Sequence, residues 1–389
     1  MNTGKPSFLR TSRGQRKGAI TVLAALMTVC MLAMVAFTVD VGYILSSEQE
    51  LQRTADSAAL AACWEYAKNR AHDNNQYDSI NAGRLVAAQY AGLNRIGGAA
   101  TQIDPNLSNS TSGDITYGRI DDLYTADPTV DTYSTKDFNA VTVRIRKNEN
   151  INGKVPLFFA KIFGLSGQEI RGEATAAYTA GISGLSVPGH GGNIDLLPFA
   201  LDEDTWNDLL AGYAPDNWAW DAETGAISSG SDGILEVNLY PQGTGSPGNR
   251  GTVDIGGSNN STNDIARQIL YGVSPTDMAH HNGVLEFDAN GELELNGDTG
   301  ISAGVKDELK AIKGQPRIIP IFSRVHGPGN NAQYTIVKWA GIRILDVKLT
   351  GPMNKKRVIV QPAPMVVEGV IPGKDDESDY VYSPVVLVN

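Results

Sequence analysis

The feature that most constrains this chain is an uncharged stretch that extends over residues 19–39. A helix of these 21 residues would be about 32 Å long, which is enough to cross the hydrocarbon core of a bilayer. A buried helix of a soluble protein rarely runs so far without a charge, and a cleaved signal has an apolar core of only about 7–15 residues. The sequence therefore predicts a transmembrane helix that is retained.

Beyond residue 39 the helical pattern continues while the composition becomes polar. Leu51, Ala55, Ala58 and Ala62 recur at helical spacing on one face, and charged or amide side chains occupy the other faces. This pattern predicts one helix over about 18–71, with one half in the membrane and the other half in water. The small side chains of that face allow close packing against either the chain's own sheet, the simpler interpretation, or a neighbouring helix.

Charge is distributed unevenly along the 389 residues, whose net charge is −11. The residues before the span include basic side chains and no acidic one, and basic residues flank the cytoplasmic end of a span. We therefore expect the N-terminus in the cytoplasm and most of the chain on the other side. An acidic exported portion argues against nucleic-acid binding, which needs a basic face. The basic residues are Lys5, Arg10, Arg13, Arg16 and Lys17.

Asp40 is the first acidic residue of the chain and stands at the outer end of the uncharged stretch. Two interpretations of this carboxylate are open. It either lies in the headgroup layer, or it pairs with a basic residue of a partner helix and sets the register of an assembly.

The rest of the chain predicts an α+β protein anchored in the membrane. A second helix is expected over about 79–95, with Ile80, Val86, Tyr90 and Leu93 on its buried face. Apolar and polar residues then alternate over 140–146, which is typical of a half-buried strand. A long N-terminal helix followed by a small sheet is the pattern of a helix-on-sheet module.

Glycine and proline mark a predicted linker at 181–193. Beyond it, the sequence predicts a mainly-β distal domain, in which residues 284–295 form a hairpin with a turn at Asn290-Gly291. The predicted organisation is a basic cytoplasmic segment at 1–18, a span at 19–39, a helix-plus-sheet module at 40–180, the linker at 181–193 and the distal domain at 194–389.

Three patterns resemble known chemical sites, and each has a simpler explanation. The GxGxxG match at 243–248 contains Pro247, which prevents the helix that a phosphate site needs. His280 and His281 are adjacent, so they point to different sides and suit a solvated surface better than a metal site. The acidic and amide residues at 288–292 lack the glycine of a calcium loop, because Leu293 occupies its position.

A GxSxG match at 300–304 places Ser302 as a candidate nucleophile, with Asp307 and His326 following in the order of a hydrolase triad. A nucleophile elbow must follow a buried strand, but Gly297, Asp298 and Thr299 precede this motif. The alternative is that Ser302 caps a helix. A membrane-anchored serine hydrolase therefore stays a secondary hypothesis.

The N-terminal motifs resemble those of the TadE/TadG-like proteins of bacterial tight-adherence (Flp) pilus-assembly systems. The resemblance covers about residues 13–62 and is specific in its combination of motifs. These are RGQRKG at 13–18, the span, VDVG at 39–42, ELQ at 50–52 and ADSAALA at 55–61. Residues from 194 onward resemble no family that we can name.

The resemblance implies a non-enzymatic bitopic protein of the bacterial inner membrane that needs no cofactor and whose helix-on-sheet module is pilin-like. Its partners would be the membrane and other pilus-assembly or envelope proteins that contact the N-terminal helix. An exported adhesin or glycan-binding protein is the main alternative. The candidate residues for the span and for assembly are Gly18, Asp40, Gly42, Leu51, Ala55, Ala58 and Ala62.

Two departures from the family pattern refine this expectation. Pseudopilins that are cleaved by prepilin peptidase carry a glutamate five residues after the cleaved glycine, and Leu23 stands at that position after Gly18. This favours a TadG-like anchor over a TadE-like pseudopilin. The DxSxS metal motif found in the von Willebrand A domain of many TadG-like proteins is absent from the sequence, so metal-dependent adhesion is not implied.

Overall fold

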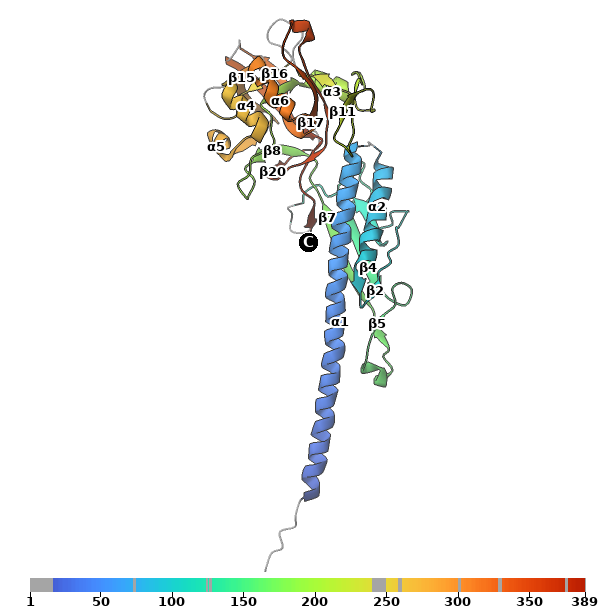
Figure 1. Cartoon of the computed structure of the whole chain (residues 1–389). Helices are drawn as coiled ribbons and strands as arrows, with labels where there is room; N and C mark the ends of the chain where they lie inside the picture. The colour runs from blue at the N-terminus through green and yellow to red at the C-terminus, as the bar shows by residue number, and fades with distance from the viewer. Residues whose placement is uncertain are drawn as a thin grey trace, which may run out of the picture.

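The computed structural model describes residues 17–72, 75–123, 125, 128–239, 250–257, 261–299, 302–327, 331–374 and 377–388. Its axis is helix α1 (Lys17–His72), a single helix of 56 residues. The N-terminal half of α1 projects alone, whereas its C-terminal half packs against the folded part of the chain (Figure 1). The predicted continuous helix is therefore confirmed, as is the α+β class with a mainly-β distal region.

The second half of α1 packs across an antiparallel sheet of four strands in the order β23-β7-β4-β3. Helix α2 packs beside α1, and together these elements form what we call the sheet module (Figure 1). Its elements besides α1 are α2 (Gln76–Leu93), β1 (Arg95–Ile96), β2 (Ala99–Ala100), β3 (Ile115–Gly118), β4 (Ala140–Lys147), β5 (Val155–Pro156), the 3₁₀ helix η1 (Ala160–Phe163), β6 (Gly167–Gln168), β7 (Ile170–Ala177) and β23 (Val386–Val388).

Helix α2 contacts α1 through small residues. Its buried positions include Ser79, Gly83, Ala87 and Ala91, which are spaced by four and therefore lie on one face. A Cβ atom at Gly83 would lie 2.8 Å from the carbonyl oxygen of Ala62, so the two backbones are almost in contact.

The predicted buried face of α2 was therefore largely wrong. Ile80 is buried, but Val86 is only half-buried, and Tyr90 and Leu93 are exposed. The reason is that the two helices approach too closely for large side chains to fit between them. The small residues form the contact, and the large apolar ones remain outside it.

The distal region is built around β17, which pairs with β15, β16, β18 and β21. The pairings β17-β15-β13-β9-β16 return to β17, so five of the described strands form a closed ring. Helices α3, α4 and α6 contribute Trp206, Ile269 and Leu309 to one of its two cores.

The strands of this region are β8 (Ile182–Ser186), β9 (Phe199–Asp202), β10 (Trp218–Trp220), β11 (Ile227–Ser229), β12 (Val237–Asn238), β13 (Arg250–Val253), β14 (Val284–Glu286), β15 (Leu293–Asp298), β16 (Pro316–His326), β17 (Ala332–Lys348), β18 (Arg357–Pro362), β19 (Met365–Val366), β20 (Val370–Pro372), β21 (Ser378–Asp379) and β22 (Val381–Tyr382). Its helices are α3 (Glu203–Leu210), α4 (Thr262–Tyr271), α5 (Pro275–Met278), η2 (Ala279–His281), η3 (Ala303–Val305), α6 (Lys306–Ala311) and η5 (Met353–Lys355).

The chain passes between the sheet module and the distal region twice. It leaves after β7 and returns after β22, so that β23 pairs with β7 at the edge of the first sheet. The two crossing segments are hydrogen-bonded to each other, because the backbone N–H of Thr179 donates to Ser383 Oγ at 2.8 Å and that of Ile182 donates to Ser378 Oγ at 3.1 Å. We call residues 178–182 and 378–383 the neck.

The segment 181–193, predicted as a linker, contains the packed strand β8. Ile182 and Leu185 of β8 are fully buried, and β8 pairs with both β14 and β20. The glycines of this segment suggested a flexible linker. Gly184 instead allows close packing, because a Cβ there would lie 2.6 Å from the carbonyl oxygen of Leu285.

The predicted hairpin at 284–295 is also wrong. The turn exists, with the N–H of Asp288 donating to the carbonyl of Glu292 at 2.8 Å. However, β14 pairs with β8 while β15 pairs with β17 and β13, so the two strands enter different sheets. Alternation of apolar and polar residues identifies a buried face but does not identify the strand that pairs with it.

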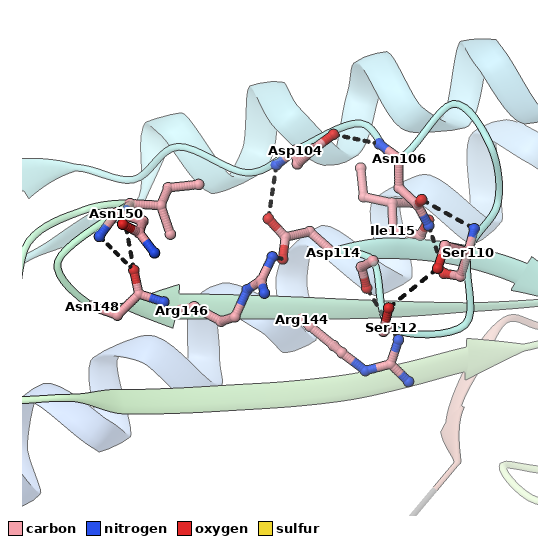
Figure 2. Close-up of polar contacts among 12 residues, drawn as sticks. Asp104, Asn106, Ser110, Ser112, Asp114, Ile115, Arg144, Arg146, Asn148 and Asn150 are labelled. Atoms are coloured by element: carbon pink, nitrogen blue, oxygen red, sulfur yellow. Dashed lines mark hydrogen bonds and ion pairs between the residues drawn. The ribbon is translucent and has the colours of Figure 1, made fainter.

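A polar network fastens the loop before β3 to the edge of the first sheet (Figure 2). The buried carboxylate of Asp114 accepts a hydrogen bond from the N–H of Asp104 at 2.9 Å and pairs with Arg146 at 2.5 Å. Asn106 donates from Nδ2 to the carbonyl oxygens of Ser110 and Ile115 at 2.8 and 2.7 Å. These contacts give the buried side chains of Asp114 and Asn106 hydrogen-bond or ion-pair partners in a loop that has no regular structure.

We predict that Gly83→Ala destabilises the protein, because its new Cβ would overlap the Tyr117 hydroxyl and crowd the carbonyl of Ala62. Gly92→Ala in the same helix is the matched control, since its Cβ would meet only the carbonyl oxygen of Thr101 at 3.9 Å. Because both substitutions gain the same helix propensity, Gly83→Ala should unfold with a free energy about 1–3 kcal/mol lower than Gly92→Ala. Denaturant unfolding of the two variants in detergent, followed by circular dichroism, measures the difference, and equal stabilities would contradict the close contact.

Candidate anchor and assembly site

The N-terminal half of α1 is long and apolar enough to cross a membrane. Its mean hydropathy reaches 2.5, and none of this most apolar segment is buried against the protein. The hydroxyls of Thr28 and Thr38 are hydrogen-bonded within the helix. Thr28 Oγ1 donates to the carbonyl of Ala24 at 2.9 Å, and Thr38 Oγ1 donates to that of Met34 at 2.8 Å. The segment therefore exposes an apolar surface on which these two hydroxyls are already hydrogen-bonded, as a bilayer core would require.

The structure places four of the candidate assembly residues inside the sheet module. Leu51, Ala55, Ala58 and Ala62 are fully buried, in the same core as residues of α2, β4 and β7. Their small size serves the chain's own packing, as the simpler interpretation expects. A partner of α1 would therefore have to contact another part of the helix.

The two candidate glycines lie outside this core. Gly18 is in the first turn of α1. Gly42 is exposed, and a Cβ at this position would have no atom within 4 Å. Close packing within the chain therefore does not require a glycine at position 42.

Asp40 lies on α1 next to η1, more than a hundred residues further along the chain. One carboxylate oxygen accepts a hydrogen bond from the N–H of Phe158 at 2.7 Å, and the other accepts one from the N–H of Ala160 at 2.7 Å. The N–H of Phe159 donates to both oxygens, at 3.3 and 3.1 Å. The carboxylate therefore caps the N-terminal end of η1.

These contacts determine the charge of Asp40. Burial raises the pKa of its carboxyl, whereas the backbone donors and the nearby Lys161 lower it. The lowering effects together are larger, so the pKa lies below the usual value. Asp40 is therefore ionised at neutral pH. Its partners are backbone groups of the same chain rather than a basic side chain of a partner helix.

Asp40 holds a loop that we call the apolar finger, residues 157–166. The finger connects the two strands of the short pair β5–β6 and contains η1, and it lies beside α1 below the rest of the sheet module, toward the projecting half of the helix (Figure 1). Phe158 packs edge-to-face on Tyr43 of α1, with ring centroids 5.3 Å apart. The exposed apolar side chains of the finger are Phe158, Phe159, Ile162, Phe163 and Leu165.

From the sequence, the apolar run PLFFAKIF at 156–163 predicts a short helix that ends at Gly164, and Asp40 stands out as the first acidic residue. The sequence does not connect the two. No local pattern links residues 118 positions apart. One feature of the sequence could have drawn attention to the finger. It contains a single charged residue, Lys161, and yet is too short to cross a membrane.

The candidate nucleophile Ser302 acts as a helix cap. Its Oγ accepts a hydrogen bond from the N–H of Gly304 at 3.2 Å at the start of η3. Within the described part of the chain, Ser302 has no hydrogen bond to Asp307 or His326. The first two residues of that motif, 300–301, and the whole GxGxxG match lie outside the described residues.

The other patterns of chemical interest lie apart from each other. His280 is exposed, whereas His281 is half-buried, and burial lowers the pKa of its imidazole. The turn at 288–292 is closed by hydrogen bonds to the Asp288 carboxylate. Among the residues that the structure describes, no group of three or more His, Cys, Asp or Glu side chains is arranged to hold a metal ion.

A hollow of about 740 Å³ separates the sheet module from the distal region. Its charged side chains have partners in the same chain. Arg70 pairs with Asp137, and Asp379 pairs with Lys338 at 3.0 Å and accepts from Trp206 Nε1 at 2.8 Å. Such pairings within the chain are typical of charged side chains that stabilise the fold, here beside the neck.

In comparisons with known proteins, the first part of the chain matches two family models. Residues 18–71 match the family model of TadE/G-like Flp pilus-assembly proteins. Residues 46–176 match a second model, that of Tad-like Flp pilus-assembly proteins. The two matches cover α1 and almost all of the sheet module, and the distal region lies outside both. Neither the curated proteins nor the solved structures gave a match.

We predict that Asp40→Asn loosens the finger, because an amide offers one acceptor oxygen and no charge where the carboxylate serves three backbone donors. Trypsin should then cut after the exposed Lys161 several-fold faster in the detergent-solubilised full chain. Glu48→Gln is the matched control, since Glu48 is an exposed carboxylate of the same helix. The cleavage rate follows from mass spectrometry of the fragment ending at Lys161, and equal rates in both variants would argue against the cap.

Proposed function

We propose that this chain is a non-enzymatic, single-span protein of the bacterial inner membrane that acts in assembly or anchoring of a Tad/Flp-type pilus or a related envelope structure. Its N-terminus would lie in the cytoplasm, and its sheet module and distal region would lie outside. The matches to pilus-assembly families support the biological setting. The basic residues before α1 support the orientation.

The observation that carries the proposal is the continuity of α1. The same helix supplies the exposed apolar segment and, without a break, the core of the sheet module. The first family match covers this helix almost from end to end. A protein built in this way holds a folded module at a fixed position above the membrane, which is the task of an anchor.

The buried face of α1 limits the part of the helix that a partner could contact. Because Leu51, Ala55, Ala58 and Ala62 pack inside the module, we place the helix–helix contact with pilus-assembly partners in the exposed segment over 20–39. Alanines distributed through this segment allow another helix to approach within the bilayer.

The orientation predicts a specific protection pattern. In spheroplasts of cells that produce the full chain, added protease should remove a C-terminal tag and leave an N-terminal tag intact, because the membrane shields only the cytoplasmic end. Both tags should be lost after lysis, and an unrelated cytoplasmic protein should be degraded only then. A protected C-terminal tag would overturn the orientation.

The partner contact predicts that affinity capture of the full chain co-purifies a secretion ATPase or platform protein of the pilus system. A variant whose residues 20–39 are replaced by a leucine-alanine helix of equal length is the matched control. It should insert as well but lose the partner, because only the sequence of the span has changed. Undiminished capture by this variant would place the contact elsewhere, and capture of no pilus component by the native chain would count against the assembly role.

A further inference from the structure

We propose that the apolar finger inserts into the outer surface of the bilayer that α1 crosses, giving the sheet module a second membrane contact. This inference rests on the proposed membrane anchor and adds a site to it. The contact would take a phospholipid surface as its ligand.

The first support is the composition of the finger surface. Ile162 and Phe163 are among the most exposed apolar side chains of the protein, at 82% and 83%. Such side chains are costly in water when several of them lie together, and this finger exposes five large ones around a single cation, Lys161. Clustered aromatic and aliphatic side chains with a basic residue are typical of a segment that lies in the membrane interface.

The second support is a sharp change of polarity along the finger. At its base, Lys154 pairs with Glu149 at 2.7 Å and with Glu169 at 3.3 Å. Beyond this charged base, residues 157–166 carry no acidic side chain. The base therefore suits water and headgroups, and the tip suits the acyl boundary.

The third support is that the finger's backbone donors are largely satisfied within the protein. Asp40 accepts from the N–H groups of Phe158, Phe159 and Ala160. Within the finger, the N–H of Leu157 donates to the carbonyl of Ser166, that of Ile162 to Phe159, that of Gly164 to Lys161 and that of Leu165 to Ala160. Backbone that enters the apolar interface must be satisfied in this way, because few water molecules are available there.

The fourth support is the position of the finger along α1. Asp40 follows directly on the uncharged stretch, so the finger lies at the level where the helix would leave the membrane. Ala36 is one turn before Asp40 on the same face of α1, and it alone among residues 20–39 is partly covered. The finger therefore extends past Asp40 toward the bilayer, in continuity with the span.

The test uses the full chain in liposomes of phosphatidylethanolamine and phosphatidylglycerol, with an environment-sensitive fluorophore on one cysteine. The background is Cys63→Ala, and the native Cys30, which is exposed in the span, is the reference for membrane insertion. Two further variants add Cys30→Ser and carry the label at Phe163→Cys or at Tyr213→Cys. Tyr213 is a matched control in the distal region, because it is 82% exposed.

We expect nitroxide lipids to quench the label at position 163 about threefold more than the label at 213, since an interfacial segment lies about 5–10 Å into the headgroup and acyl boundary. Aqueous iodide should show the opposite order. If the label at Cys30 is quenched by lipid but that at 163 behaves like that at 213, the finger does not insert and the anchor stands. If neither 30 nor 163 is quenched, the anchor itself fails. If the label at 163 is shielded only after addition of a pilus-assembly protein, the finger binds protein instead of lipid.

Discussion

The close approach of three backbones is the constraint on which the rest of the structure depends. On one side of α1, Gly83 of α2 faces the carbonyl of Ala62. On another side, Gly172 of β7 faces Leu51 and Gln52, where a Cβ would lie 2.5 Å from Leu51 Cδ2 and 3.3 Å from the backbone nitrogen of Gln52. Alanine and glycine at these contacts let the sheet and the second helix pack tightly on both sides of α1. The apolar half of the helix is therefore the extension of a firmly packed element.

Asp40 adds a second constraint at the boundary between the two halves of α1. Its carboxylate binds the backbone of the finger, so the position of the finger along the helix is determined by the chain itself. Because these oxygens are already engaged, they are poorly suited to pair with a basic residue of another helix. The acidic residue at the end of the span is better explained by intrachain capping than by assembly register.

Local periodicity was sufficient to predict the elements that contain their own pattern. The continuous α1 and the strand at 140–146, observed as β4, follow from helical spacing and from alternation. The buried face of α2 could not be found in this way, because apolar periodicity gives most weight to large side chains such as Leu93. The contact depends instead on Gly83 and its small neighbours.

Contacts between segments far apart in the chain were the other feature that the sequence pattern could not predict. No local signal joins Asp40 to the finger, β14 to β8 rather than to β15, or β23 to the first sheet. Each of these contacts depends on how separate segments meet after folding. Helical spacing puts Leu51, Ala55, Ala58 and Ala62 on one face of α1, but only the packed structure shows that the chain itself covers this face.

The neck determines how the distal region is attached to the anchor. A single linker would leave its orientation free, whereas two crossing segments that are hydrogen-bonded to each other restrict rotation. Tyr178 and Tyr382 reinforce them by packing edge-to-face with ring centroids 5.5 Å apart, one from each segment. Since β23 continues this return segment into the sheet that packs on α1, two strands of that sheet, β7 and β23, lead directly into the neck. The double crossing thus restricts how the distal region is oriented relative to the sheet module, which is what the proposed anchoring role would need.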